Sequence, residues 1–500
     1  MSKGRAADRK NRGKSRAAES KPVRRSLTLD SLKGRPWFWP AVIFAVAFAL
    51  RALYTFQVRY TPFFQTLGLD AKFYDAWARS IASGEGTRGA FFMSPLYPYF
   101  LAGIYQLFGR DLLLVRMIQA AMGAASASLT YLLALRVFDR RVGLAAGFVV
   151  AAYGALIYYD CSILMTPLLV LLSLSALFLL LKADDTGRPV DYLLAGALMG
   201  LAGIGRAAGL LFVPVAFLWI WPGSRSGTAG KRDSRGAARR TGRLRSAAVF
   251  AAGVLLVIAP VTVRNFVASG DFVPVTSNGG LNFYIGNSAR ATGGYAKPEG
   301  LDIITDPDGR AIAEAALGRE LSPSEVSGYW YRRAWSDVGE DPGRWLRLLG
   351  RKLNFVTSSY ELPQLENYYF QKRYSPLLRL PLPGFAVIAP LGFLGLGLSL
   401  RRRKARLLSL FVATYLVSIA AFFVVARYRL PVVPALSALA AFAVFELIRR
   451  ARSGGLKRLV LPAAVLAVLA FLVNANLYGI DRERGFAQPH FRLGLIYAQR

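Results

Sequence analysis

The residues best suited to chemistry are a lone carboxylate and several arginines at the ends of apolar stretches. Asp70 opens a short amphipathic stretch in the segment between the first two apolar runs. A carboxylate held there can act as a general base on an acceptor hydroxyl. It can equally serve as a helix N-cap, and the two roles are compatible. We therefore take Asp70 as the candidate catalytic residue.

Three arginines are candidates for binding a phosphate. Arg206 separates two short apolar runs, and Arg427 and Arg429 lie in the segment Ala426–Pro431 between two others. The guanidinium group is always charged and presents a planar fork that matches phosphate oxygens. The alternative is that these side chains reach to lipid headgroups.

Other polar residues are candidates for substrate binding. Asp160 ends an apolar run, where it could orient a substrate, supply a second carboxylate, or cap the following helix. Asn282 and Asn287 lie in a Gly/Asn-rich stretch whose amides could hydrogen-bond sugar hydroxyls, although turn formation explains the composition as well. Arg51, inside the first apolar run, is assigned a structural role.

The sequence offers no support for metal or nucleotide chemistry. It has one cysteine, Cys161, and one histidine, His490, so His-rich metal sites and an intrachain disulfide are excluded. No phosphate-binding G-x-x-x-x-G-K-[ST] loop, dinucleotide fingerprint, H-E-x-x-H or C-x-x-C is present. We expect no cofactor and no metal.

The elements that carry these residues are apolar segments long enough to cross a membrane. Hydrophobic residues make up 54% of the chain, and a span needs about 20 mostly apolar residues. About eleven segments qualify: 38–57, 112–137, 142–159, 162–181, 190–206, 207–222, 247–264, 383–400, 407–425, 430–448 and 458–477. The sequence therefore predicts an all-α integral membrane protein with an external mixed loop domain.

Charge fixes the expected orientation. The chain has 63 Lys+Arg against 29 Asp+Glu, a net charge of +34. The basic connections fall on one side when eleven spans are threaded, and the positive-inside rule makes that side cytoplasmic. This pattern favours topology signals over nucleic-acid binding. We predict a multi-pass protein of the inner (cytoplasmic) membrane with its N-terminus inside and its C-terminus outside.

The same arrangement of eleven spans divides the chain into a tail, two helical bundles joined by a linker, and a C-terminal segment. Residues 1–36 are expected to form a disordered basic tail, and 223–246 a cytoplasmic linker. The linker separates a first bundle, 37–222, from a second, 247–478, while 479–500 lies outside.

Two long external segments, 58–111 and 265–382, follow from this topology. Helix signals in them are Asp70 as an N-cap, Pro95 and Pro98 in a first turn, and a capping box at Ser322–Glu325. Asp341-Pro342 opens a basic amphipathic helix that fits either the outer leaflet or the core of a small domain.

Four stretches together carry a family resemblance. They are Asp70-Ala71-x-x-Tyr74-Asp75-x-x-Ala78, Ser94-Pro95-Leu96-Tyr97-Pro98-Tyr99, Gly280-Leu281-Asn282-Phe283-Tyr284-Ile285-Gly286-Asn287, and Arg427-Tyr428-Arg429-Leu430-Pro431-x-x-Pro434. Over about residues 38–450 the chain resembles membrane glycosyltransferases of the GT-C fold. The similar proteins are bacterial relatives of the protein O-mannosyltransferases and the lipid-A aminoarabinose transferases.

The resemblance implies an inverting transfer of a hexose or pentose from a polyprenyl-phosphate carrier to an acceptor hydroxyl at the outer face. Asp70 matches the family's acidic residue in the first loop and would be the general base, and Tyr74 of the same stretch is expected to bind substrate. The arginines would stabilise the departing phosphate. The acceptor could be a glycan, a lipid or a protein. Two departures stand out: Ala71 follows Asp70 where many relatives have a second acid, and Met165-Thr166-Pro167 lacks the acid of the fourth span.

Other interpretations remain at this stage. A transporter or lipid flippase without covalent chemistry would have paired broken spans in two similar halves, and no such repeat is evident. A membrane scaffold is the third. The C-terminal pattern Ala487-x-x-His490-x-x-Leu493-Gly494-x-x-Tyr497 resembles the first helix of a tetratricopeptide repeat, which suggests a protein partner for this segment.

Overall fold

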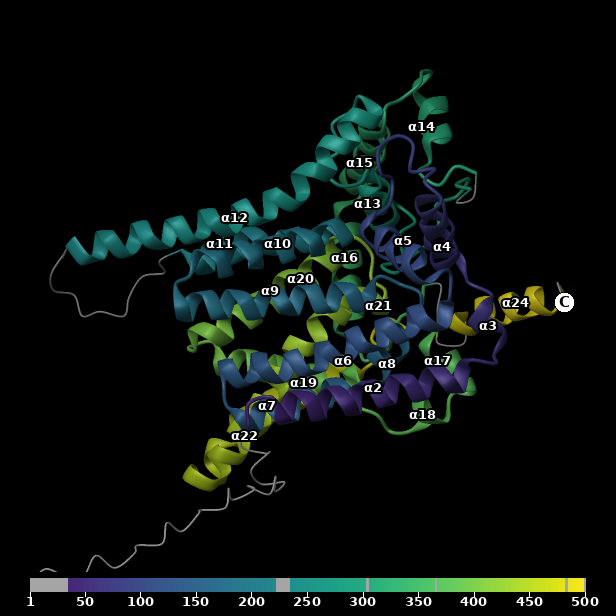
Figure 1. The fold of residues 1–500 in the computed structure, drawn as a ribbon. Coiled ribbons are helices and arrows are strands. Elements are labelled where there is room, and N and C mark those ends of the chain that lie inside the picture. Colours follow the sequence, from purple (N-terminus) through teal and green to yellow (C-terminus); the bar gives the residue numbers. More distant parts are fainter. Residues whose placement is uncertain (1–34, 222–233, 303–304, 365–366, 482–483, 499–500) are drawn as a thin grey trace, which may run out of the picture.

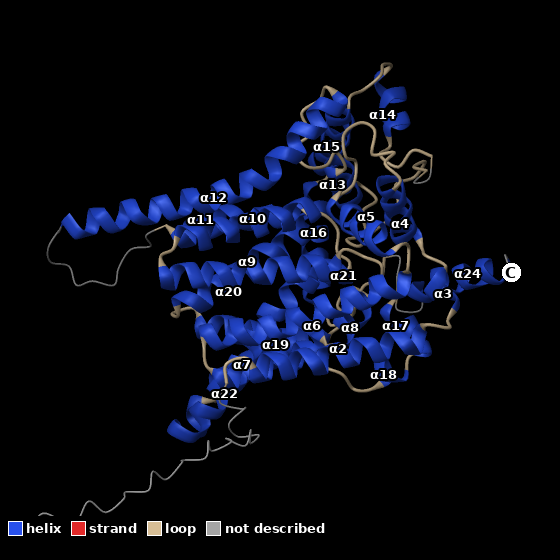
Figure 2. Ribbon diagram, in the orientation of Figure 1, coloured by secondary structure: helices blue, strands red, loops and turns tan. Residues whose placement is uncertain are grey.

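The fold is a helical bundle with further helices gathered toward one end (Figure 1). The computed structural model describes residues 35–221, 234–302, 305–364, 367–481 and 484–498. Within these ranges the chain forms helices and loops and no strand, as Figure 2 shows. The prediction of an all-α architecture is therefore confirmed.

Each predicted span coincides with an apolar helix. Among the described residues, 6 helices are long and apolar enough to cross a membrane, and a bent pair would make 7. The long helices are α2 (Phe38–Val58), α6 (Leu112–Val137), α9 (Thr166–Thr186), α12 (Ser234–Ser269), α20 (Arg403–Ala421) and α22 (Val433–Gly454). The bent pair is α7 (Arg140–Ala151) and α8 (Gly154–Asp160).

Four apolar helices are shorter than a full span. They are α10 (Pro189–Gly205), η1 (Ala207–Leu211) with α11 (Phe212–Ile220), α19 (Phe385–Ser399) and α23 (Val460–Asn474). In the bundle α2 packs on α6 and α7, α10 packs between α9 and α12, and α19 packs on α22 and α23. Because α22 also packs on α7, the helices before and after the expected linker share one core.

The bend of 56° between α7 and α8 is stabilised by Arg51 of α2. The break frees the carbonyl of Ala151, which accepts a hydrogen bond from Arg51 Nη1 at 3.0 Å. Arg51 Nε also pairs with Asp160 Oδ2 at 2.8 Å, and both side chains are buried. A buried charge is tolerated when it is paired and hydrogen-bonded, so Arg51 takes the structural role expected of it.

The remaining helices belong to the segments predicted to be external, 58–111, 265–382 and 479–500. They are α3 (Pro62–Gln65), α4 (Leu69–Ala82), α5 (Leu96–Phe108), α13 (Gly279–Asn287), α14 (Arg310–Leu317), α15 (Pro323–Glu340), α16 (Pro342–Thr357), α17 (Tyr368–Gln371), η2 (Lys372–Tyr374), α18 (Pro376–Arg379) and α24 (Arg484–Ala498). Short turns α21 (Ala426–Arg429), η3 (Leu430–Val432) and η4 (Leu456–Arg458) complete the chain.

Helix starts in these segments follow the sequence signals in part, since α5 begins at Leu96, so that Pro95 is its N-cap and only Pro98 lies in the first turn. The capping box at Ser322–Glu325 forms at the start of α15, and Asp341 caps α16. At α4, however, Gly68 is the N-cap and Asp70 lies in the first turn without a capping bond. The Asp70 carboxylate is consequently free to contact another part of the chain.

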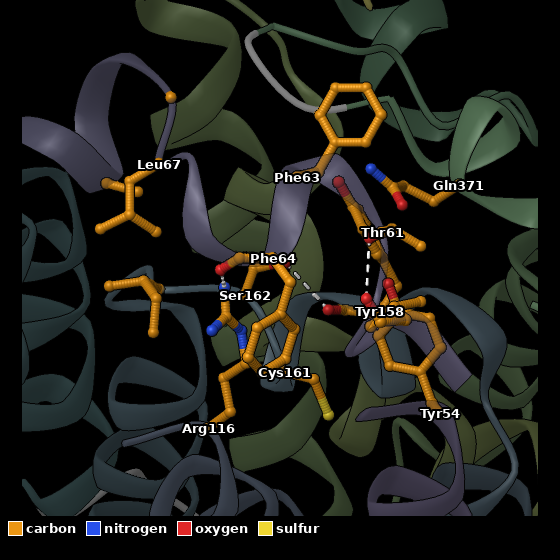
Figure 3. A pocket seen from close by; sticks show the side chains of 14 residues that line it. Tyr54, Thr61, Phe63, Phe64, Leu67, Arg116, Tyr158, Cys161, Ser162 and Gln371 are labelled. Atoms are coloured by element: carbon orange, nitrogen blue, oxygen red, sulfur yellow. Dashed lines mark hydrogen bonds between the residues drawn. The ribbon is translucent and has the colours of Figure 1, made fainter. Parts of the chain in front are cut away.

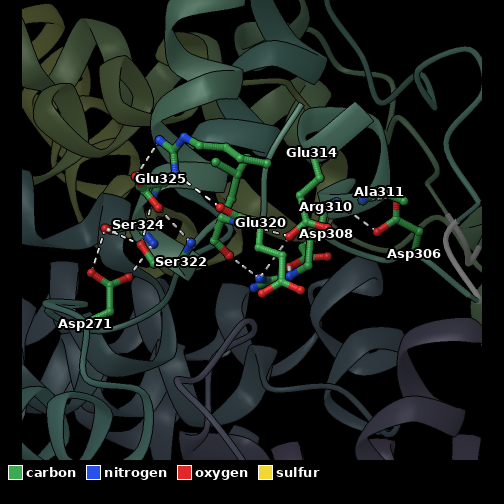
Figure 4. A network of polar contacts seen from close by, with 12 residues as sticks. Asp271, Asp306, Asp308, Arg310, Ala311, Glu314, Glu320, Ser322, Ser324 and Glu325 are labelled. Carbon is green, nitrogen blue, oxygen red and sulfur yellow. Dashed lines mark hydrogen bonds and ion pairs between the residues drawn. The ribbon is translucent and has the colours of Figure 1, made fainter. Parts of the chain in front are cut away.

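A polar network ties the external segment to the bundle (Figure 4). Asp271, just beyond α12, accepts hydrogen bonds from the amide and the hydroxyl of Ser324 at 2.6 and 2.7 Å. Burial opposes ionisation of Asp271, but these bonds prevail and its pKa lies below the usual value. The start of α15 is thus fixed beside the end of α12.

Charged pairs join several helix ends at the other end of the bundle. Arg403 at the start of α20 pairs with Asp184 at the end of α9 at 3.0 Å, and Lys182 pairs with Asp191 of α10 at 2.8 Å. These residues lie in connections expected on the cytoplasmic side. Residues 1–34 and 222–233, which hold most of the tail and part of the linker, lie outside the described residues; from Ser234 onward the expected linker is helical.

Candidate functional site

The centre of the site is an ion pair between Asp70 and Arg427. Arg427 Nη2 donates to Asp70 Oδ2 at 2.5 Å and to Gln364 Oε1 at 2.8 Å. The side chains of Asp70 and Arg427 are 20% and 13% exposed, so the pair is sheltered without being sealed. Residues 357 positions apart in the sequence therefore meet, as the predicted mechanism requires.

Three elements bring these groups together. Asp70 lies in the first turn of α4, Gln364 lies in the loop after α16, and Arg427 lies on α21. The amide of Ala426 donates to the carbonyl of Leu362 at 2.8 Å, which fixes α21 against the loop of Gln364. Since α20 starts among the charged helix ends and leads into α21, the site lies at the opposite end of the bundle.

Aromatic rings surround the pair. The guanidinium carbon of Arg206 lies 3.4 Å from the centre of the Tyr428 ring, and that of Arg427 lies 5.4 Å from the same ring. Tyr74, one turn after Asp70, is buried. Burial and, next, the negative charge of Asp70 raise the pKa of the Tyr74 phenol, so it remains a neutral hydrogen-bonding group.

Arg206 is placed differently from Arg427. It is the C-cap of α10 and is partly exposed. Within the described ranges its guanidinium stacks on Tyr428 and makes no hydrogen bond or ion pair. A guanidinium stacked by its face keeps its in-plane N–H groups available to an anion.

Arg429, two residues beyond Arg427, is not brought to the site. Its side chain is 1% exposed and donates to the carbonyls of Ser358 and Tyr360. It also pairs with Glu361 at 2.9 Å. These contacts hold the loop that leads to Gln364, so the position of Arg429 favours a supporting role over phosphate binding.

Two other predicted residues are also engaged elsewhere. Asp160 is buried against Arg51 inside the bundle. Asn287 is buried, donates to the carbonyls of Phe283 and Ala421, and accepts from Trp345 and Lys352. These bonds use the amide to join α13, α16 and the end of α20.

Asn282 is partly buried on α13, and its side chain has no hydrogen bond to the described residues. The structure brings it into no contact with Asp70 or Arg427. Among the described residues, no group of three or more His, Cys, Asp or Glu side chains could hold a metal ion. The positive charge that pairs with Asp70 is that of Arg427.

A cavity of about 50 Å³ lies behind the first turn of α4 (Figure 3). Gly68 and Ala71, on either side of Asp70, contribute to its wall, whereas Asp70 does not. The rest of the wall comes from α2, α3, α6 and the turn after α8: Tyr54, Val58, Thr61, Phe63, Phe64, Leu67, Arg116, Tyr158, Cys161, Ser162 and Ile163, with Gln371 of α17. The cavity therefore adjoins the start of α4, and neither Asp70 nor Arg427 is part of its wall.

Gln364 and Tyr295 were not predicted as site residues. Gln364 shares the Arg427 donor, and Asp70 contributes to the raised pKa of Tyr295, after burial, which places this phenol close to the carboxylate. Both lie in loops whose sequence has no helical or turn pattern pointing to the site. Their roles depend on tertiary contacts that no local signal encodes.

The sequence profile of the dolichyl-phosphate-mannose-protein mannosyltransferase family matches residues 93–231. This part of the chain is similar to a membrane glycosyltransferase family. The resemblance stated from the sequence is thereby confirmed. The matched range contains Arg206 but neither Asp70 nor Arg427, so it does not test the central pair. A comparison with curated proteins finds no match.

A search of solved structures finds similarity to ArnT and to an archaeal oligosaccharyltransferase. ArnT from Cupriavidus metallidurans bound to undecaprenyl phosphate is 17% identical, with a TM-score of 0.48, covering 93% of this chain and 70% of that chain. The oligosaccharyltransferase of Archaeoglobus fulgidus, in a complex with Zn and sulfate, is 17% identical, with a TM-score of 0.47, covering 87% and 53%. The chain thus spans about half the length of the archaeal protein.

Proposed function

We propose that the protein is a glycosyltransferase that moves a sugar from a polyprenyl-phosphate carrier to an acceptor hydroxyl. The reaction takes place at the outer face of the cytoplasmic membrane and inverts the anomeric carbon. The observation that carries this proposal is the meeting of Asp70 with Arg427 beside Arg206, at the end of the bundle away from the basic connections.

Asp70 is the proposed general base. Its carboxylate takes the proton of the acceptor hydroxyl while the hydroxyl oxygen attacks C1 of the sugar. The bond between C1 and the phosphate oxygen breaks, and its electron pair leaves with polyprenyl phosphate. Because the acceptor attacks the face opposite the phosphate, the product has the inverted configuration.

The arginines are proposed to stabilise the leaving phosphate. Charge builds up on the phosphate in the transition state, and fixed cationic donors placed there lower the barrier. Arg206 has in-plane N–H groups available, and Arg427 Nε is buried without a hydrogen-bond acceptor among the described residues. A phosphate oxygen would supply that missing acceptor.

The pair also suggests an order of events. Arg427 Nη2 donates to Oδ2 of Asp70, one of the two oxygens of the proposed base. A phosphate that attracts Arg427 would loosen this contact and release Asp70 for the acceptor. The base would then act only when the donor is in place, which protects the carrier-linked sugar from hydrolysis by water.

The family match supports the donor class. The name of the matched family specifies dolichyl-phosphate-mannose, a sugar linked to a polyprenyl phosphate. For this chain we propose only the class of the two substrates. The sugar is a hexose or a pentose, and the acceptor is a glycan, a lipid or a protein.

A test uses the purified protein with polyprenyl-phosphate-mannose or polyprenyl-phosphate-arabinose and a solubilised cell-envelope fraction as acceptor. Released polyprenyl phosphate is measured by mass spectrometry, and the anomeric configuration of the product by NMR. We expect release that depends on the acceptor fraction, with inversion. Retention of configuration, or consumption of neither donor by a folded protein, would contradict the proposal.

A further inference from the structure

The C-terminal helix α24 contacts both loops that supply the site. Figure 1 shows α24 beside α3, close to the end of the bundle that carries α4 and α17. Its first half packs on the segment 367–373: Asn367 Nδ2 donates to the carbonyl of Gly485 at 2.6 Å, and the His490 ring lies edge-on to Phe370 at 5.1 Å. This segment follows Gln364 closely in the chain.

The second half of α24 reaches the connection before Asp70. Arg492 Nη2 donates to the carbonyl of Thr66 at 3.0 Å, and its guanidinium carbon lies 5.5 Å from the centre of the Phe63 ring. The guanidinium also lies against Gly68, where an added Cβ would meet the Arg492 nitrogen in a severe overlap. A glycine is therefore needed at position 68 for this close approach.

The connection held by Arg492 leads directly into the first turn of α4. Gly68 is the N-cap of α4, and its carbonyl accepts a hydrogen bond from the amide of Lys72 at 2.9 Å. Asp70 follows two residues later. This connection also lines the cavity of about 50 Å³, through Leu67 and Gly68. Arg116 Nη2 holds the chain just before this connection through the carbonyl of Phe64 at 2.8 Å, and Arg492 holds the connection itself through the carbonyl of Thr66.

The location of the guanidinium is not what helix electrostatics alone would favour. The N-terminus of a helix carries partial positive charge, so a cation there is unfavourable. Arg492 is held at the start of α4 by the Thr66 carbonyl and the Phe63 ring. These two contacts, and not the electrostatics of the helix end, therefore hold Arg492 beside the first turn on which Asp70 lies.

We propose that Arg492 is a positioning residue for transfer: it fixes the connection 66–68 and so sets Asp70 against Arg427. Helix α24 thereby links the loop of Asp70 to the loop of Gln364, and both partners of Arg427 keep their relative positions. This inference rests on the proposed function, because it assigns the order of the loop to the reaction of Asp70.

The test compares Arg492→Ala with Gln488→Ala, a change at an exposed position of the same helix. Small misplacement of a catalytic group costs up to about 100-fold in rate, and we expect Arg492→Ala to lower kcat about 10-fold with the donor KM within twofold. Arg492→Lys, which can still donate to Thr66, should recover part of the loss. Hydrogen exchange of the amides at the start of α4 should accelerate in Arg492→Ala alone. The donor used is polyprenyl-phosphate-mannose or polyprenyl-phosphate-arabinose, whichever wild type consumes.

Gly68→Ala provides an independent variant. Its φ of −96° suits alanine, and the added methyl displaces only the flexible end of Arg492. We expect the same loss of kcat and the same faster exchange. The proposal is overturned if Arg492→Ala matches Gln488→Ala in kcat and in exchange. If Asp70→Asn abolishes transfer in that same case, the proposed function stands while the role of Arg492 falls.

Discussion

At the scale of residues, the three candidate arginines differ in which acceptors their guanidinium groups already have. Arg429 is bonded to backbone carbonyls and Glu361, Arg427 is shared by Asp70 and Gln364, and Arg206 is stacked on Tyr428. A ligand phosphate would have to displace the contacts of Arg429, whereas it would add contacts to Arg206. We therefore propose unequal parts for them in donor binding.

Arg206→Gln should weaken donor binding. A hydrogen bond to a charged group is worth about 1.5–3 kcal/mol, so we expect the donor KM to rise roughly 10- to 100-fold. Initial rates against donor concentration measure this, with the exposed Arg59→Gln as control. An unchanged donor KM in Arg206→Gln would remove this arginine from the phosphate site.

Lys352 makes a second prediction at this scale. It is buried, its Nζ donates to Asn287 at 2.9 Å, and burial lowers its pKa to about 7. The unfolded chain therefore binds more protons between about pH 7 and the ordinary lysine pKa, and stability rises with pH across that window. Below about pH 7 Lys352 is protonated in both the folded and the unfolded chain, so it no longer makes the stability depend on pH.

The measurement is the thermal unfolding midpoint at pH 7 and pH 9.5 for wild type and Lys352→Met. We expect the midpoint of wild type to rise more between the two pH values than that of the methionine variant. Equal changes in the two proteins would show that Lys352 does not contribute to the pH dependence.

The sequence predicted that Asp70, Arg427 and Arg429 share one site, whereas the structure brings together only Asp70 and Arg427, for a geometric reason. In a helix, residues two positions apart in the sequence are about 200° apart around the axis. Arg427 and Arg429 of α21 therefore point in nearly opposite directions. The motif names both, and only the fold of α21 distinguishes them. Gln364 could not be predicted because its contact depends on the loop after α16 returning to α21.

At the scale of elements, hydropathy located the membrane helices well because lipid requires long, continuous apolar segments. It did not predict the break between α7 and α8, since Ala151–Gly154 is apolar and has no proline. The break depends on Arg51 of another helix donating to the freed carbonyl of Ala151. Tertiary contacts of this kind are absent from a hydropathy profile.

Gly123 of α6 is essential to this buried pair. A Cβ at this position would lie 2.1 Å from Asp160 Oδ2 and 2.5 Å from Arg51 Nε. Disrupting a buried ion pair costs about 3–5 kcal/mol, so Gly123→Ala should lower the free energy of unfolding by about 3 kcal/mol. Gly103→Ala on α5, where a Cβ meets nothing within 4 Å, is the control. Equal unfolding midpoints in detergent for the two variants would contradict this account of the bend.

At the scale of the whole molecule, the charged helix ends and the Asp70 site occupy opposite ends of the bundle. Positive charge is retained on the cytoplasmic side, so the site should face outward. Cys161 is buried and should not react, which leaves introduced cysteines as clean reporters. We expect a membrane-impermeant maleimide to label Glu320→Cys in intact cells and Arg401→Cys only after lysis. The reverse pattern would place the site on the cytoplasmic side.

The central claim is that the Asp70 carboxylate removes the proton of the acceptor. The most direct measurement is the transfer rate of purified Asp70→Asn at saturating polyprenyl-phosphate sugar, beside Glu85→Gln, which removes an exposed carboxylate from the same loop. General-base catalysis contributes about 10²- to 10⁴-fold, so we predict a loss of at least about 100-fold in Asp70→Asn with the donor still bound. Transfer by Asp70→Asn at the rate of Glu85→Gln would contradict the account.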